Sequence, residues 1–171
     1  MRNSTLLFLI KRDGATKAIT DICLAMKKRG FGVGRYNGVG GKVNEKDGET
    51  IPAATIREAE EEVGIKIAGG ERALQKIAEH TFTFPHNEAW NQVVHTYFCE
   101  EWQGDPIESE EMKPQWFAVA DIPYSTMWPD DKFWLPRALA GEKLRCAFTF
   151  GEGDIILGQK IEGVQGVIWV C

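Results

Sequence analysis

Residues 51–63, IPAATIREAEEEV, constrain the fold more than any other stretch of this chain, because they predict a helix with two unlike faces. Pro52 suits the first turn of a helix, and Gly64 suits the position just past its end. At ~100° of rotation per residue, several apolar side chains fall on one face, where they can pack against a sheet. These residues are Pro52, Ile56, Ala59 and Val63.

The other face of this predicted helix carries Glu58, Glu61 and Glu62 at i, i+3 and i+4 spacing. Neighbouring like charges cost ~0.2–0.5 kcal/mol per pair in an isolated helix, and the negative end of the helix dipole adds to that cost. A hard divalent cation such as Mg²⁺ would make this clustering of carboxylates favourable, since Mg²⁺ prefers carboxylate oxygens and retains waters for a phosphate substrate. Arg57 can offset part of the charge. The alternative interpretation is an acidic face that is simply solvated.

The rest of the chain combines predicted strands with one further helix. Alternating or continuous apolar runs predict strands at residues 5–11, 22–26, 73–84, 92–102, 115–119, 144–150 and 154–161. Residues 130–140 predict a second helix, and residues 30–41, with six glycines, predict a loop or an irregular strand. This order of elements predicts an α/β (α+β) fold in which helices pack on a mixed sheet.

The length of 171 residues and the composition, 43% apolar and 26% charged, fit a single globular domain over residues 1–171. The net charge of −5 offers no basic surface for a nucleic acid polymer. An acidic protein that binds a polyanion usually does so through a local device such as a metal ion. We expect a monomer that binds no nucleic acid polymer.

The cysteines indicate a reducing compartment. Cys23, Cys99, Cys146 and Cys171 form no C-x-x-C pair and match no zinc site, and the first two sit in apolar runs. We interpret them as reduced thiols of a cytoplasmic protein. The apolar run at residues 6–10 is too short for a signal peptide and is followed by charged residues. No stretch approaches the ~18 apolar residues of a membrane span, so we expect no membrane partner.

Extending the acidic helix outward gives residues 40–65, GGKVNEKDGETIPAATIREAEEEVGI. From about residue 41 they resemble the signature of the Nudix hydrolases, G-x5-E-x7-R-E-U-x-E-E-x-G-U, where U is aliphatic. The fixed positions of its second half all match, at Glu49, Arg57, Glu58, Glu61, Glu62, Gly64 and Ile65. Ala59 is small for its aliphatic position. Seven residues rather than five separate Gly41 from Glu49, which predicts a longer surface turn near Lys46 and Asp47.

The resemblance implies the Nudix α/β/α sandwich with a mixed central sheet, and hydrolysis of a nucleoside diphosphate linked to another group. It also implies a Mg²⁺ cofactor, with Mn²⁺ as a substitute, and activation of water by a glutamate inside or outside the motif. The implied catalytic residues are Glu58, Glu61 and Glu62, and the implied metal ligands are these three with Glu111 and the Gly40 carbonyl. The implied structural residues are Gly41, Glu49, Arg57 and Gly64.

A wider resemblance, over about residues 4–161, points to the members of this family that hydrolyse oxidised purine nucleoside triphosphates. The segments that carry it are residues 26–43, 108–117, 122–134 and 148–157. The longer first hairpin, the inserted turn and the tail at residues 162–171, which receives no role, depart from the pattern. The residues implied to bind the substrate are Thr5, Lys27, Phe31, Asn37, Trp128, Asp130 and Asp131.

The implied reaction converts substrates such as 8-oxo-dGTP and 2-hydroxy-dATP to the monophosphate and pyrophosphate. Asn37 offers a donor and an acceptor to a purine edge, and Trp128 offers a stacking face. In a dry pocket one of two carboxyls can stay protonated, so Asp130 and Asp131 can read either base. Two alternatives are a Nudix hydrolase of another nucleoside diphosphate derivative and a Nudix-fold binding module without catalysis.

The pocket residues also have plainer interpretations. Asp130 or Asp131 can be the N-cap of the second helix, and Asn37 can be a turn residue between glycines. Glu111 and its acidic neighbours can be a solvated loop. Tyr36 replaces the family's tryptophan beside Asn37, which predicts a changed pocket shape. The three histidines show no constellation and receive no role.

Overall fold

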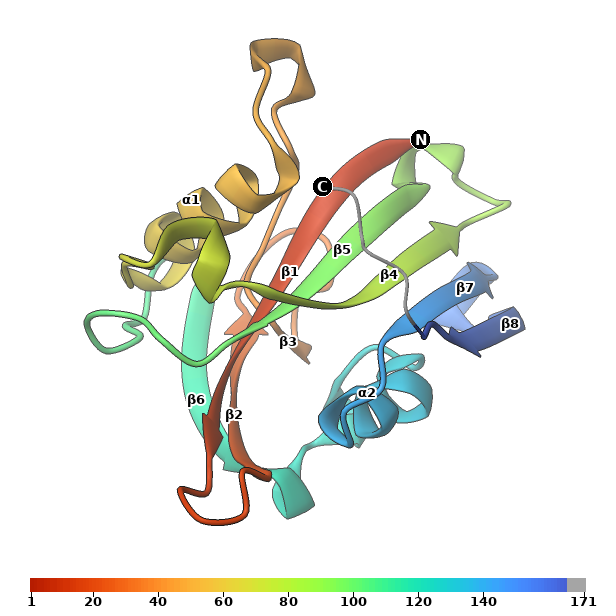
Figure 1. The fold of residues 1–171 in the computed structure, drawn as a ribbon. Helices are drawn as coiled ribbons and strands as arrows, with labels where there is room; N and C mark the ends of the chain where they lie inside the picture. Colours follow the sequence, from red (N-terminus) through yellow and green to blue (C-terminus); the bar gives the residue numbers. More distant parts are fainter. Residues whose placement is uncertain (166–171) are drawn as a thin grey trace.

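The computed structural model describes residues 1–165, in which a mixed sheet separates two helices. Helix α1 (Ile51–Val63) covers one face of the sheet and α2 (Asp131–Leu139) covers the other, as Figure 1 shows. The described strands are β1 (Arg2–Arg12), β2 (Ile19–Lys27), β3 (Tyr36–Asn37), β4 (Gln75–Thr83), β5 (Gln92–Cys99), β6 (Met112–Ala118), β7 (Leu144–Phe150) and β8 (Ile156–Gly163). The predicted α/β/α sandwich with a mixed sheet is confirmed.

Strand β1 lies in the middle of the sheet and contributes side chains to both helical layers. The strand order is β3-β2-β1-β5-β4-β7-β8, and β6 pairs with β2 outside this path. Strand β1 runs parallel to β5, and β4 runs parallel to β7. Phe8 and Ile10 belong to the core around α2, whereas Leu7 and Leu9 belong to the core under α1. The period-two pattern of β1 therefore builds both cores.

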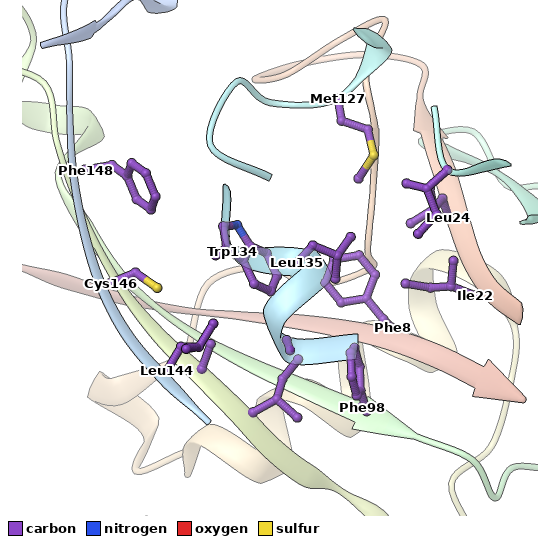
Figure 2. Close-up of a cluster of buried hydrophobic side chains, with 14 of the residues drawn as sticks. Phe8, Ile22, Leu24, Phe98, Met127, Trp134, Leu135, Leu144, Cys146 and Phe148 are labelled. Carbon is purple, nitrogen blue, oxygen red and sulfur yellow. The ribbon is translucent and has the colours of Figure 1, made fainter. Parts of the chain in front are cut away.

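The core between the sheet and α2 fixes the position of that helix (Figure 2). Trp134 and Leu135 of α2 are almost fully buried in one cluster with Phe8, Phe98 and Phe148. Burying each of these side chains stabilises the fold by ~1.5–3 kcal/mol. The residues at the start of α2 are therefore held on a rigid support.

Strands β1 and β2 pair directly only near residues 10–12 of β1, and the glycine-rich segment fills the gap between their other halves. In that gap Val39 pairs with Leu7 through two backbone hydrogen bonds of 2.7 and 3.0 Å. A Cβ at position 38 would lie 2.6 Å from the Leu7 carbonyl oxygen, and one at Gly40 would overlap the Thr5 carbonyl. The glycines allow this close approach, and the prediction of a loop or an irregular strand is confirmed.

The predicted ends of helices and strands agree best with the structure where the sequence signal is local. The helix at residues 51–63 and the strand at residues 144–150 are confirmed at both ends. Strand β4 starts at Gln75, later than predicted, because residues 70–73 form a short 3-10 helix. Strand β6 starts at Met112, earlier than predicted, because it pairs with β2 along its full length.

The predicted faces of α1 need a correction. Ile56 is only half-buried, whereas Thr55 and Glu62 are buried on the side facing the protein. The Thr55 hydroxyl is satisfied by donating to the Ile51 carbonyl at 2.9 Å. Burial of Glu62 is possible because the backbone N–H of Gly40 donates to its carboxylate at 3.0 Å. The three glutamates therefore do not share one solvated face.

The inserted turn ahead of α1 is present as predicted. It forms a short 3-10 helix, Glu45–Asp47, that projects from the body of the protein in Figure 1. Gly48 ends it in the left-handed conformation, with a φ of 75°. Neither end of α1 is displaced, so the insertion is absorbed at the surface.

The described cysteines are buried free thiols, at positions 23, 99 and 146. Cys171 and the end of the C-terminal tail lie outside the described residues. Neither described helix is long and apolar enough to cross a membrane.

Candidate active site

One cavity of about 930 Å³ gathers all the residues predicted to bind a substrate. It is lined by segments that are far apart in the sequence: the start of β1, the end of β2, the glycine-rich segment and the start of α2. The predicted residues on its wall are Thr5, Lys27, Phe31, Asn37, Trp128, Asp130 and Asp131. Tyr36 is not among the lining residues, and its hydroxyl donates to the Gln115 carboxamide oxygen at 3.1 Å.

A pair of buried aspartates forms one side of this cavity. Asp130 and Asp131 are 2% and 3% exposed. The indole N–H of Trp134 donates to Asp130 Oδ2 at 3.0 Å and to Asp131 Oδ1 at 3.1 Å. Asp130 stands at the N-cap position of α2, as the plainer interpretation predicts, but neither carboxylate makes a capping hydrogen bond. Asp131 Oδ2 has no hydrogen-bond partner within residues 1–165, which leaves it available to a ligand.

Burial changes the protonation of this pair. It raises the pKa of Asp130 to about 7 and the pKa of Asp131 well above its ordinary value, and the charge of Asp130 raises the latter further. The Trp134 hydrogen bonds and the Arg35 charge oppose these rises. Two carboxyls so close cannot both ionise easily, so the pair keeps a proton near neutral pH. It can then donate one hydrogen bond and accept another.

Aromatic rings form another wall of the cavity. The Trp128 ring stacks on Phe31 with centroids 5.0 Å apart and an interplanar angle of 30°. Phe31 is 44% exposed and also contacts Trp90 at 5.3 Å. The Asn37 carboxamide oxygen accepts from the Gly38 N–H at 2.8 Å, which fixes its orientation. A flat heterocycle can therefore stack on this wall while Asn37 contacts its edge.

A second, smaller hollow of about 300 Å³ adjoins the cavity and is acidic. Its lining residues are Arg29, Glu58, Glu61, Glu62, Ser109, Glu110 and Glu111. Arg29, Glu62 and Glu111 line the larger cavity as well. A ligand that fills both spaces would extend from the aspartate pair to the glutamates.

Glu62 connects the two spaces. It is 6% exposed, and burial raises the pKa of Glu62 to about 7. Its Oε1 lies 3.9 Å from the Lys27 ammonium, which also lies 3.4 Å from Glu111 Oε2. Burial also raises the pKa of Glu58, and a Cβ at position 41 would lie 2.5 Å from Glu58 Oε1. Glycine at position 41 therefore gives Glu58 its space.

Arg57 ties the acidic helix to the turn that precedes it. Its guanidinium bonds to Glu49 at 2.7 Å, to Glu58 at 2.8 Å and to Glu61 at 3.1 Å. It also donates to the Lys42 carbonyl at 3.0 Å. Glu49 in turn accepts from the Asn44 N–H at 2.8 Å. This network bridges the inserted turn, so Glu49 reaches Arg57 despite the two additional residues.

The oxygen donors around the small hollow fit the chemistry of Mg²⁺ but do not form a finished cage. Within residues 1–165, no three His, Cys, Asp or Glu side chains converge into a ready-formed metal site. Arg57 and Lys27 contact the glutamate oxygens instead. The raised pKa values of Glu58 and Glu62 reflect burial and mutual repulsion, which a divalent cation would relieve.

Comparison with known proteins identifies the family. The NUDIX domain family model matches residues 2–138. The chain belongs to the Nudix hydrolase family. It is 41% identical over 144 residues to the oxidized purine nucleoside triphosphate hydrolases of Mus musculus and Danio rerio, covering 84% of this chain and 88% of each relative.

Solved structures of Nudix proteins share the fold. The MutT protein of Bacillus halodurans superposes with a TM-score of 0.76 at 19% identity, over 95% of this chain and 98% of that one. A MutT Nudix hydrolase of Burkholderia pseudomallei has a TM-score of 0.56 at 26% identity, over 81% and 95% of the two chains. The likeness extends over most of each chain.

The site of this Nudix hydrolase also contains residues that the sequence did not single out. Arg35 contacts Trp128, and His80 lies under Trp134 with ring centroids 4.4 Å apart. Both line the cavity, together with Phe82 and Phe84. Burial lowers the pKa of His80 to about 3, so its ring is neutral. The alternation of residues 80 and 82 in β4 and 84 just past its end was a signal that they share one face.

Proposed function

We propose that this Nudix hydrolase is a Mg²⁺-dependent pyrophosphohydrolase of oxidised purine nucleoside and deoxynucleoside triphosphates. It would convert substrates such as 8-oxo-dGTP and 2-hydroxy-dATP to the monophosphate and pyrophosphate. The relatives from mouse and zebrafish, whose names state this substrate class, support the proposal.

The observation that carries the proposal is that the aspartate pair and two of the glutamates line the same cavity. Asp130, Asp131, Glu62 and Glu111 line one cavity, whose volume of about 930 Å³ is ample for a nucleotide. The base end is buried and aromatic, whereas the other end is acidic and adjoins the hollow lined by Glu58. A purine at the first end directs its triphosphate toward the second.

The glutamates would hold the metal at the phosphate end. Bound Mg²⁺ would neutralise phosphate charge and activate a water for attack on the β-phosphorus. Glu58, Glu61, Glu62, Glu111 and the Gly40 carbonyl are the candidate ligands. Arg57 keeps Glu58 and Glu61 in place, and the Gly40 N–H holds Glu62. Any of the carboxylates that does not ligate the metal is available as the base.

The aspartate pair would read the oxidised base. A protonated carboxyl donates to a carbonyl or ring nitrogen, and an ionised one accepts from an N–H or amino group. Because the pair can hold its proton on either residue, it can match the hydrogen-bond pattern of 8-oxo-guanine or of 2-hydroxyadenine. Asn37 adds a further donor and acceptor on the same cavity wall.

Pyrophosphate release from 8-oxo-dGTP, 2-hydroxy-dATP, dGTP and dATP tests the proposal, with Mg²⁺ and then with a chelator. We expect kcat/KM for an oxidised purine to exceed that of its normal parent by at least about tenfold, since a site with buried polar groups discriminates by hydrogen bonding. The chelator should abolish turnover. Metal-dependent hydrolysis of oxidised and normal nucleotides at equal rates would be consistent with the glutamate site. It would contradict the proposal that the aspartate pair reads the base.

A further inference from the structure

The guanidinium of Arg35 joins three segments that are distant in the sequence. Its central carbon lies 4.2 Å from the centroid of the Trp128 ring, and its Nη1 lies 2.8 Å from Asp154 Oδ2. Arg35 precedes β3, Trp128 precedes α2, and Asp154 lies in the turn between β7 and β8. The side chains of Arg35 and Asp154 are 27% and 28% exposed, so the pair is partly shielded from solvent.

Both ends of this contact are held by neighbouring groups. The backbone of Arg35 is fixed, because its carbonyl accepts from the Lys27 N–H at 3.0 Å and its N–H donates to the Gly32 carbonyl at 3.2 Å. Trp128, like Arg35, lies outside any helix or strand; its carbonyl accepts from the Asp131 N–H at 3.1 Å, and its ring contacts Phe31 and Phe150. Arg35 therefore adds a cation to the aromatic contacts that the Trp128 ring makes with Phe31 and Phe150.

The turn that carries Asp154 is shaped to present the carboxylate. Asp154 has a φ of 59°, in the left-handed region that residues other than glycine rarely adopt. Its N–H donates to the Gly151 carbonyl at 3.1 Å, which closes the turn. An aspartate in this conformation is less favourable than a glycine, and the ion pair with Arg35 offsets that cost.

We propose that Arg35 and Asp154 form a positioning pair that holds Trp128 in the orientation in which it stacks on the purine. This inference rests on the proposed function, because it assumes that Trp128 contacts the base. A cation over an indole face contributes more when it is partly desolvated, and Asp154 directs the guanidinium onto that face. Arg35 is a positioning residue and need not touch the reacting phosphates.

Binding of 8-oxo-dGMP, measured by calorimetry without metal, tests this pair directly. We expect Arg35→Ala to weaken binding about tenfold and Asp154→Asn about threefold. Arg35→Lys should recover only part of the loss, because an ammonium lacks the planar face that lies over the indole. Arg35→Ala combined with Asp154→Asn should bind no more weakly than Arg35→Ala alone, since Asp154 acts through Arg35.

The matched control is Arg137→Ala, which removes another arginine–carboxylate pair, with Glu142, away from the cavity. It should bind 8-oxo-dGMP like the unmodified protein. In steady-state kinetics, Arg35→Ala should raise KM for 8-oxo-dGTP while kcat stays within about twofold, because the phosphate end is untouched. A general structural defect would lower kcat as well.

The outcomes separate this inference from the proposed function. If the unmodified protein binds 8-oxo-dGMP and Arg35→Ala binds it equally well, the positioning pair is wrong and the proposed function stands. If the unmodified protein does not bind 8-oxo-dGMP more tightly than dGMP, both are wrong. Should Arg35→Ala fold poorly, Asp154→Gly removes the carboxylate at a left-handed position that glycine adopts freely. Unchanged binding by that variant also contradicts the pair.

Discussion

The carboxylates of α1 and those at the start of α2 have the same chemistry and different neighbours. Glu58 and Glu61 are bound by the Arg57 guanidinium, and Glu62 lies 3.9 Å from Lys27. Asp130 and Asp131 are buried, and both accept a hydrogen bond from the neutral indole of Trp134. In the first group, cations oppose the rise in pKa that burial causes in Glu58 and Glu62. In the second, burial raises the pKa of both aspartates, and the charge of Asp130 raises that of Asp131 further.

The comparison shows how environment assigns a role to a carboxyl group. Charged oxygens that share a hollow with solvent and cations are suited to a metal ion and its phosphate ligand. Carboxyls that retain a proton in a dry pocket are suited to donating and accepting hydrogen bonds from a base. The expectation that follows is a division of labour, with rate controlled at α1 and base selectivity at α2.

The largest effect is expected from Glu58→Gln, which should lower kcat by ~10²–10³-fold, the scale of losing one electrostatic contact to a transition state. The melting temperature should change little, because the amide oxygen can still accept from Arg57. Glu60→Gln, an exposed neighbour on the same helix, is the matched control and should keep full activity. Turnover of Glu58→Gln equal to that of the control would remove the metal-site proposal.

Asp131→Asn should reduce the preference for 8-oxo-dGMP over dGMP by ~10–100-fold in calorimetric Kd, because an amide cannot change its donor and acceptor pattern by moving a proton. Asp121→Asn, an exposed aspartate away from the cavity, is the control. An unchanged ratio in the first variant would show that the pair does not read the base.

Asp131→Asn should also be more stable than the unmodified protein at high pH. Because burial raises the folded-state pKa of Asp131, the folded protein binds more protons than the unfolded chain, and stability falls as pH rises above the unfolded value. We expect Asp131→Asn to be more stable than the unmodified protein at pH 8, and the gain to be smaller at pH 5. Thermal unfolding of both proteins at the two pH values measures this. An equal gain at both would indicate that the pair does not titrate.

The smallest effect is expected from Arg57→Lys, which keeps the charge but loses the fork of hydrogen bonds to Glu49, Glu58 and Glu61. It should cost ~1–2 kcal/mol in the free energy of unfolding by denaturant. Arg137→Lys is the control, because its exposed pair with Glu142 should contribute ~0–1 kcal/mol. Equal losses in both variants would show that the Arg57 network has no special role.

The sequence predicted the parts of the fold that depend on local signals. Helix α1 was bounded by Pro52 and Gly64, and both ends agree with the structure. The start of β6 at Met112 was not predicted, because it depends on pairing with Lys27, far away in the chain. The burial of Glu62 was missed for the same reason, since its partner is the backbone N–H of Gly40.

In the candidate site, too, local signals were predictive and contacts between distant segments were not. A resemblance over contiguous motifs was enough to gather the seven substrate-binding candidates, and the structure brings them to one cavity. Arg35 and Asp154 were overlooked although both lie in segments that carry the resemblance, because only the folded chain brings the guanidinium to Trp128 and to the carboxylate. Contacts between distant segments leave no local pattern in the sequence.

The most direct test of the division of labour is a set of kcat/KM values for 8-oxo-dGTP and dGTP, measured for the unmodified protein, Glu58→Gln and Asp131→Asn. The account predicts that Glu58→Gln lowers both values by the same factor and leaves their ratio unchanged. It predicts that Asp131→Asn lowers the ratio and leaves dGTP hydrolysis close to normal. A changed ratio in Glu58→Gln, or an equal loss for both nucleotides in Asp131→Asn, would contradict it.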